Sequence, residues 1–259
     1  MTPSPPLPEH LAPGNPSRAV ADIDQPTDYL LSKPRYALSY HRDRGIPSWV
    51  HWHLSTDWRG SGARQNDFRP DATLPTSWYR YQVQANSYTG SGFDRGHNCS
   101  SADRTSTVAD NSATFLMTNM MPQAPRNNQQ TRANLEDHCR TFLSTGNEVY
   151  IICGGYGRGG AGTDGYATTL DNGRVTVPAR CWKVVVILPT GTSDASRVTA
   201  GTRVIAIDTP NDNSLSTNWG TYRTSVDAIE TATGLDILSA VSTTVQQTVE
   251  SRVDNGPTS

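Results

Sequence analysis

The stretch Phe93-Asp94-Arg95-Gly96-His97 ends an extended segment and places a histidine beside an arginine. The glycine between these two side chains lets a ligand approach the backbone closely. A second stretch, Asn119-Met120-Met121-Pro122-Gln123-Ala124-Pro125-Arg126-Asn127-Asn128-Gln129, is rich in side-chain amides and precedes a helical pattern. The two stretches supply an imidazole, a guanidinium and amide oxygens. These groups can form one site only if the fold brings the two stretches together.

The segment from Asn128 to about residue 143 predicts a helix that ends at Gly146. Its apolar stripe consists of Leu135, Cys139, Phe142 and Leu143. Asn128, Arg132 and Glu136 recur every four residues and are expected to share a face beside that stripe. An amide, a cation and a carboxylate would then line one side of the helix. Because Asn128 stands at the helix start, its side chain could instead serve as an N-cap.

These side chains suit the hydrolysis of a phosphodiester, which needs a base for water and positive charge for the phosphate and the leaving oxygen. A neutral His97 suits the first task near pH 7, and Arg95 shares the charge. Mg²⁺ keeps most of its waters, so the amide of Asn128 is sufficient as a single protein ligand. Two simpler interpretations stay open: His97 as a hydrogen-bonded core histidine, and Asp94 as an ion-pair partner of Arg95 rather than a metal ligand.

Strand and helix signals are mixed along the chain without regular alternation. Strands are predicted at residues 36–40, 49–54, 114–118, 148–153, 181–188 and 203–207. Helices are predicted at residues 128–143, 224–232 and 243–252. The glycine-rich stretch 154–173 lacks a GxxxxGK[ST] pattern and is expected to be a hairpin loop. The mixture predicts an α+β fold with a mostly antiparallel central sheet flanked by helices.

The first 25 residues are rich in proline and are predicted to be a surface or mobile tail. A single domain is expected over residues 26–259. His51 and His53 share one face of the 49–54 strand, whose alternation suits one buried face. Since no third ligand is in sight, this pair is expected to face solvent or to be hydrogen-bonded.

Composition excludes several classes of protein. The 259 residues are 35% hydrophobic and carry a net charge of -2, so no global positive field attracts nucleic acid. No apolar run approaches the ~20 residues of a membrane span. Lysine occurs at positions 33 and 183, and the other basic residues are arginine. Arginine binds phosphate bidentately, although codon use in a GC-rich genome explains the bias as well.

The four cysteines, at positions 99, 139, 153 and 181, form no CxxC pair, which disfavours a zinc site. At least one disulfide is expected, with Cys99–Cys139 as the suspected pair, and four free core thiols are the alternative. Met1 leads into a proline-rich stretch with no apolar core. The expectation is a secreted or periplasmic protein whose leader is missing from this sequence.

The motifs resemble those of the DNA/RNA non-specific endonucleases. This ββα-metal (His-Me finger) family includes secreted bacterial sugar-non-specific nucleases and mitochondrial endonuclease G. The likeness runs from about Tyr29 to the C-terminus. The segments that carry it are Asp94-Arg95-Gly96-His97, Ser101-Ala102-Asp103-Arg104-Thr105, Thr118-Asn119-Met120-Met121-Pro122-Gln123, Asn127-Asn128-Gln129 and Leu135-Glu136.

The resemblance implies a Mg²⁺-dependent endonuclease, with Mn²⁺ as a substitute ion. It implies cleavage of single- or double-stranded DNA and RNA to 5′-phosphate and 3′-hydroxyl ends. His97 matches the general base, and Asn128 matches the single protein ligand of the metal. Glu136 matches a carboxylate that acts through water on the metal.

The resemblance also implies roles for arginines and amides. Arg95 matches a cation near the scissile phosphate. Arg64 is similar to the arginine that stabilises the transition state, with Arg69 as the fallback. The amides that match residues shaping the site and holding substrate are Asn119 and Gln123.

Three departures from the family pattern surround these motifs. Gln130-Thr131-Arg132 stands where relatives usually have glycine, a small residue and tryptophan. Arg126 replaces a common acidic residue, and Asn98-Cys99-Ser100-Ser101 follows the histidine in place of a Cys-Pro-Ser run. Arg126 and Arg132 should tighten phosphate binding at low salt. With Asp94, they are included among the expected substrate contacts.

Two alternatives remain. One is a phosphodiesterase of the same fold with a smaller substrate, and the other is a nucleic-acid-binding module without turnover. The expected partner is DNA or RNA, bound through the phosphate backbone rather than the base edges. A protein inhibitor and the oligomeric state are left open.

Overall fold

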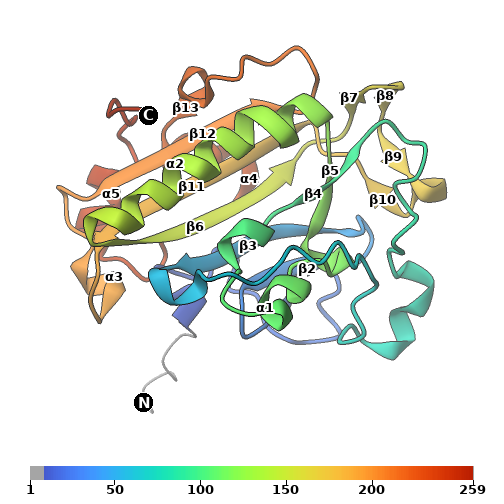
Figure 1. Ribbon diagram of the computed structural model, residues 1–259, viewed down its shortest axis with the longest axis horizontal. Helices are drawn as coiled ribbons and strands as arrows, with labels where there is room; N and C mark the ends of the chain where they lie inside the picture. Colours follow the sequence, from blue (N-terminus) through green and yellow to red (C-terminus); the bar gives the residue numbers. More distant parts are fainter. Residues whose placement is uncertain (1–8, 259) are drawn as a thin grey trace.

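A seven-stranded sheet forms the centre of the protein in the computed structural model, which describes residues 9–258 (Figure 1). The strand order is β1-β2-β3-β6-β11-β12-β13, and every neighbouring pair is antiparallel. The strands are β1 (Tyr29–Ser32), β2 (Ala37–His41), β3 (Ile46–Leu54), β6 (Asn147–Tyr156), β11 (Arg180–Pro189), β12 (Arg203–Pro210) and β13 (Arg223–Thr224). The predicted α+β class with a mostly antiparallel central sheet is confirmed.

Both faces of the central strands are buried. In β11, Val184 and Val186 pack into one apolar cluster, whereas Val185 packs into another on the opposite face. Burial stabilises each such valine by about 1.5–3 kcal/mol relative to exposure, so this run favours a central position in the sheet. In β3, every residue from Trp49 to Leu54 is buried. The expectation of one buried face for the 49–54 strand is therefore wrong.

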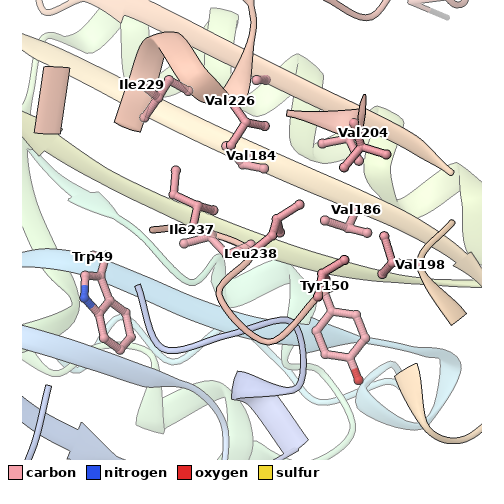
Figure 2. Packing of buried hydrophobic residues seen from close by; sticks show 14 of the residues in the cluster. Trp49, Tyr150, Val184, Val186, Val198, Val204, Val226, Ile229, Ile237 and Leu238 are labelled. Carbon is pink, nitrogen blue, oxygen red and sulfur yellow. The ribbon is translucent and has the colours of Figure 1, made fainter. Parts of the chain in front are cut away.

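Helices cover the two faces of the sheet (Figure 1). On one face, α2 (Ala133–Thr141) contributes Leu135 and Cys139 to the cluster that contains Val185. On the other, α4 (Val226–Thr233) places Val226 and Ile229 against Val184, as Figure 2 shows. The remaining α-helices of residues 9–258 are α1 (Val108–Ala113), α3 (Asp194–Arg197) and α5 (Thr243–Val249). No helix in this range is long and apolar enough to cross a membrane.

Three small two-stranded sheets complete the strand structure of residues 9–258. They are β4 (Asp94–His97) with β5 (Met120–Gln123), β7 (Gly160–Gly162) with β8 (Gly165–Ala167), and β9 (Thr169–Leu170) with β10 (Val175–Thr176). The β7–β8 hairpin lies in the stretch predicted to be a hairpin loop. The strand predicted at residues 114–118 is wrong. The N–H and the hydroxyl of Thr114 both donate to the Asn111 carbonyl. These hydrogen bonds stabilise a turn at Thr114, and the strand begins only at Met120.

The segment before β1 is held by the segment after α4. The Asp236 N–H donates to the Pro16 carbonyl at 2.8 Å. Leu11 and Ala19 are buried in the cluster that also contains the α4 residues. The prediction of a surface or mobile tail over the first 25 residues is therefore wrong for Leu11 and Ala19. The first eight residues lie outside the part of the chain that the structure describes.

All four cysteines are free and buried, so the expectation of a disulfide is wrong. Cys99 and Cys139 belong to one apolar cluster, where they fill space as small hydrophobic side chains. Burial raises the pKa of Cys139 and that of Cys181 to about 12. These thiols therefore stay protonated and unreactive near neutral pH.

The two histidines of β3 have different surroundings. His53 is hydrogen-bonded, as expected, with Nδ1 2.7 Å from Glu9 Oε1 and Nε2 3.2 Å from Glu148 Oε2. His51 is fully buried, and neither ring nitrogen has a hydrogen-bond partner among the described residues. Burial lowers the pKa of His51 to about 3. It also lowers the pKa of His10 to about 4, with help from the nearby charge of Arg104.

These buried neutral histidines predict a loss of stability in mild acid. Their pKa values lie below the ordinary value of 6.5, so the unfolded chain binds more protons between about pH 6.5 and 4. We expect the free energy of unfolding to fall with pH in that window, by about 1.4 kcal/mol per pH unit for each histidine. Urea unfolding at several pH values measures the slope. His51→Leu should reduce this slope by the contribution of one proton. Equal slopes in the two proteins would contradict the conclusion that His51 is neutral in the folded state.

Candidate active site

A hairpin followed by a helix carries the motif residues (Figure 1). β4 pairs with β5 so that Asp94 lies opposite Gln123 and His97 lies opposite Met120. After β5 the chain enters a π-helical segment, Asn127–Arg132, and continues directly into α2. The paired strands β4 and β5, with α1 between them in the sequence, and the following α2 form the expected ββα arrangement. It places the DRGH strand and the asparagine segment in one compact element.

Gly96 allows the two strands and their side chains to pack closely. A Cβ atom at this position would lie 2.4 Å from the amide group of Gln123. Gln123 is fully buried, and neither of its amide atoms has a hydrogen-bond partner among the described residues. The glycine is therefore required by contact within the protein, and Gln123 offers no exposed amide to a substrate. We therefore do not propose a contact between Gln123 and substrate.

The His97 ring is fixed between two phenylalanines. It meets Phe115 edge-on, with ring centroids 4.8 Å apart, and lies 5.6 Å from the ring of Phe68. The residue is half-buried, and its Nε2 has no partner among the described residues. Burial, followed by the positive charges of Arg64 and Arg95, lowers the pKa of His97 to about 3. The imidazole is therefore neutral at physiological pH, and it is not a hydrogen-bonded core histidine.

The two arginines beside His97 are held by aromatic faces. The Arg95 guanidinium carbon lies 3.7 Å from the centroid of Phe68, and Nη1 donates to the Ala85 carbonyl at 3.1 Å. The Arg64 guanidinium carbon lies 5.0 Å from the centroid of Phe115. Stacking fixes these cations with few hydrogen bonds, so N–H donors remain for a phosphate.

Arg64 and its fallback Arg69 have different partners. Arg64 donates to the Ser101 hydroxyl, and its charge acts on His97. Arg69 instead forms an ion pair with Asp67 at 2.7 Å and donates to the Ser112 carbonyl at 3.0 Å. The geometry therefore favours Arg64 as the arginine of the site.

The Asn128 side chain is oriented by Asp94. Its Nδ2 donates to Asp94 Oδ2 at 2.8 Å, and Gln129 Nε2 donates to the same oxygen at 2.8 Å. The Asn128 Oδ1 accepts no hydrogen bond from the described residues and belongs to a half-buried side chain. An oriented amide oxygen of this kind fits a hard divalent ion. Asp94 accepts these amide hydrogen bonds and forms no ion pair with Arg95.

Glu136 is paired with a buried lysine. Lys183 Nζ, on β11, donates to Glu136 Oε1 at 2.6 Å, and the lysine is fully buried. Burial favours the neutral acid, but the charges of Lys183 and Arg132 outweigh it and lower the pKa of Glu136. Glu136 is therefore an ionised carboxylate, and its charge reaches His97. Sequence reasoning missed Lys183, although a lone charged residue within an apolar strand was a signal for a buried partner.

Two expected substrate contacts lie inside the protein. Asn119 is fully buried, where Oδ1 accepts from the Cys99 N–H at 2.9 Å and Nδ2 donates to the Cys99 carbonyl at 3.0 Å. Arg132 is 1% exposed, and its Nη1 donates to the Trp182 carbonyl at 3.4 Å. Neither side chain is available at the surface. Asn119 instead fixes the backbone that follows His97.

Arg126 and Asp94 differ from these two because they reach the surface. Arg126 is exposed, with its backbone N–H donating to Asn213 Oδ1 at 3.0 Å and its side chain donating to the Leu215 carbonyl. Asp94 and Arg95 help to line a surface hollow of about 210 Å³ beside the motif. Of the expected site residues, the structure thus brings His97, Arg64 and Arg95 together, whereas Arg126 contacts the segment of Asn213 and Leu215.

Comparison with known proteins gives one consistent result. A family model described as DNA/RNA non-specific endonuclease matches residues 16–244. A nuclease from Nostoc sp. (strain PCC 7120) is 49% identical over 97% of this chain and 88% of its own length. Human mitochondrial endonuclease G is 32% identical over 62% of this chain and 56% of its own length. A solved structure of the EndoG/EndoGI complex shares the fold, with a TM-score of 0.73 and 23% identity over 93% of this chain and 94% of that one.

Proposed function

Because this chain belongs to the DNA/RNA non-specific endonuclease family, we propose that it hydrolyses the phosphodiester bonds of DNA and RNA without sequence preference. Two observations support the proposal: a neutral His97 lies beside two arginines, and on the same ββα element Asp94 orients the side chain of Asn128. Cations of this kind contact phosphate, which is the same at every nucleotide. Binding through phosphate therefore does not distinguish one base sequence from another.

In the proposed mechanism, His97 is the general base. Its neutral imidazole accepts a proton from the water that attacks phosphorus. Arg64 and Arg95 balance the charge that builds on the phosphate oxygens. A bound phosphate also offsets the arginine charges that lower the pKa of His97, so the imidazole becomes a stronger base when substrate is present. The products are a 5′-phosphate and a 3′-hydroxyl.

We propose Mg²⁺ as the cofactor, with Asn128 as its protein ligand and Mn²⁺ as a substitute. The amide oxygen of Asn128 is a hard ligand of the kind that these ions prefer, and the ionised carboxylate of Glu136 would act through water on the ion. When bound, the ion supplies positive charge to the phosphate and the leaving oxygen. Lys183 holds Glu136 in place, and we propose that this carboxylate accepts hydrogen bonds from water in the site.

A secreted or periplasmic location remains a prediction. Its support from cysteine pairing is lost, because all four thiols are free. The proposed partner is nucleic acid, bound through phosphate, and the exposed Arg126, two residues before Asn128, is a proposed further contact.

Cleavage of supercoiled plasmid tests the proposal. With Mg²⁺ we expect nicking, then linearisation and degradation of plasmid and of structured RNA, and no cleavage with excess chelator. Bis(p-nitrophenyl) phosphate serves as the small-substrate control. Turnover of this compound without cleavage of plasmid would favour the phosphodiesterase alternative. Plasmid binding without any turnover would favour the silent binding module.

A further inference from the structure

Three carboxylates meet between the C-terminal helices, far from the proposed active site in the sequence. Ligand oxygens of Asp227, Glu230 and Glu250 all lie within 4.8 Å of one another. Asp227 and Glu230 are three residues apart on α4 and so share one face of that helix. Glu250 directly follows α5. None of the three takes part in an ion pair within residues 9–258.

Glu250 distinguishes this cluster from a solvated acidic patch. The residue is 5% exposed, and its buried Oε1 has no hydrogen-bond partner among the described residues. One carboxylate oxygen of this residue lies within 4.8 Å of oxygens of Asp227 and Glu230. An unpaired carboxylate is costly to bury, and two neighbouring carboxylates increase that cost. A bound cation removes both penalties.

The backbone around Glu250 is built to hold it in place. The Asp227 N–H donates to the Glu250 carbonyl at 3.1 Å, and the Glu250 N–H donates to the Gln246 carbonyl at 2.8 Å. Glu230 Oε1 accepts from the Ile237 N–H at 2.6 Å, which leaves its second oxygen for a ligand. The three side chains are therefore positioned by elements that are fixed before any ion binds.

We propose that Asp227, Glu230 and Glu250 bind a structural divalent cation, Ca²⁺, that ties the end of α5 to α4. Ca²⁺ takes oxygen ligands at about 2.3–2.6 Å, so two ligands across one ion are up to about 5 Å apart. The observed separations fit within that span. Carboxylates without histidine or cysteine select a hard ion, and the exposure of Asp227 leaves room for waters.

This site is separate from the proposed catalytic one and does not rest on it. Val226 and Ile229 of α4 pack on one face of the central sheet (Figure 2), and Leu135 and Cys139 of α2 pack on the other. The sheet thus stands between the two sites. The ion would stabilise the C-terminal helices without contact with His97 or Asn128.

Calcium titration of chelator-treated protein tests the proposal. The probe is CaCl2, followed by calorimetry and by the thermal unfolding midpoint. An Asn128→Ala background removes the proposed catalytic ligand, so that any remaining Ca²⁺ binding reports on the new site. We expect one Ca²⁺ to bind in this background and to raise the unfolding midpoint. Glu250→Gln, which keeps the shape of the side chain, should weaken that binding by about tenfold or more.

Two further variants keep the result interpretable. Asp227→Asn alters an exposed ligand that does not threaten folding, and it should also weaken Ca²⁺ binding. Asp57→Asn removes an exposed carboxylate elsewhere and should leave binding unchanged. In an otherwise wild-type chain, Glu250→Gln should retain Mg²⁺-dependent cleavage of plasmid.

The proposal is overturned if the Asn128→Ala protein shows no heat of binding and no shift with Ca²⁺. It is also overturned if Glu250→Gln and Asp227→Asn bind Ca²⁺ as tightly as the protein with the intact cluster. If the protein binds no Ca²⁺ and its unfolding midpoint falls as the pH rises towards 8, the proposal is also overturned. The three carboxyl groups would then share a proton instead of a cation. Failure to cleave plasmid would leave the calcium result unaffected, so the two proposals fail separately.

Discussion

His97→Ala lowers the single-turnover rate of plasmid cleavage by about 10²–10⁴-fold, the range that a positioned general base contributes. The substitution removes the imidazole between Phe68 and Phe115 and leaves both arginines in place. Substrate binding, measured by fluorescence anisotropy with chelator present, should therefore change little. Added imidazole should restore part of the lost rate, because a free base can enter the space left by the side chain.

The matched control is His41→Ala. His41 is also a partly buried histidine whose burial lowers its pKa, but it lies on β2 outside the site. It should retain nearly full activity, while both variants keep a cooperative thermal transition. Full activity in the His97 variant would remove the base assignment. A loss of equal size in both variants would point to folding rather than chemistry.

Asn128→Ala should fail mainly through the metal. We expect the Mg²⁺ concentration for half-maximal cleavage to rise by about tenfold or more, since even outer-shell partners change metal affinity by about 10- to 100-fold. High Mg²⁺ should then recover part of the rate. The measurement is the cleavage rate as a function of Mg²⁺ concentration at saturating plasmid.

Gln129→Ala provides the matched comparison for that variant. Gln129 and Asn128 each donate one hydrogen bond to Asp94 Oδ2, at the same 2.8 Å. Both substitutions therefore remove one amide donor from Asp94, but only Asn128 is a proposed ligand. The Mg²⁺ dependence of Gln129→Ala should stay close to that of the wild-type protein. Equal shifts in the two variants would assign the effect to Asp94 rather than to a metal ligand.

The sequence predicted the parts of the site that depend on local pattern. The DRGH strand, the helix that ends at Gly146 and the three valine- and isoleucine-rich strands all appear where periodicity and composition place them. Gly146 adopts a positive φ of 76°, as a glycine at the end of a helix commonly does. These features follow from residues that are close in sequence, so no tertiary contact was needed to foresee them.

Arg132 could not be placed correctly because the expected helix begins with a different geometry. Residues 127–132 form a π-helix, in which hydrogen bonds span five residues rather than four. Side chains four apart therefore no longer share a face, and Arg132 turns into the protein. Distant contacts accompany this wide turn: the Thr131 hydroxyl donates to the Ser216 carbonyl at 2.8 Å, and Thr209 Oγ1 donates to Asn127 Oδ1 at 3.1 Å. Such contacts leave no periodic signal in the sequence.

The contact between Pro16 and Asp236 constrains how the chain can be made. Leu11 shares its cluster with Ile237 and Leu238, and the Pro13 carbonyl accepts from the Ala240 N–H at 3.0 Å. During synthesis, the first of these partners emerges long before the second. The apolar side chains of residues 11–19 therefore stay unprotected until residues 236–240 have left the ribosome.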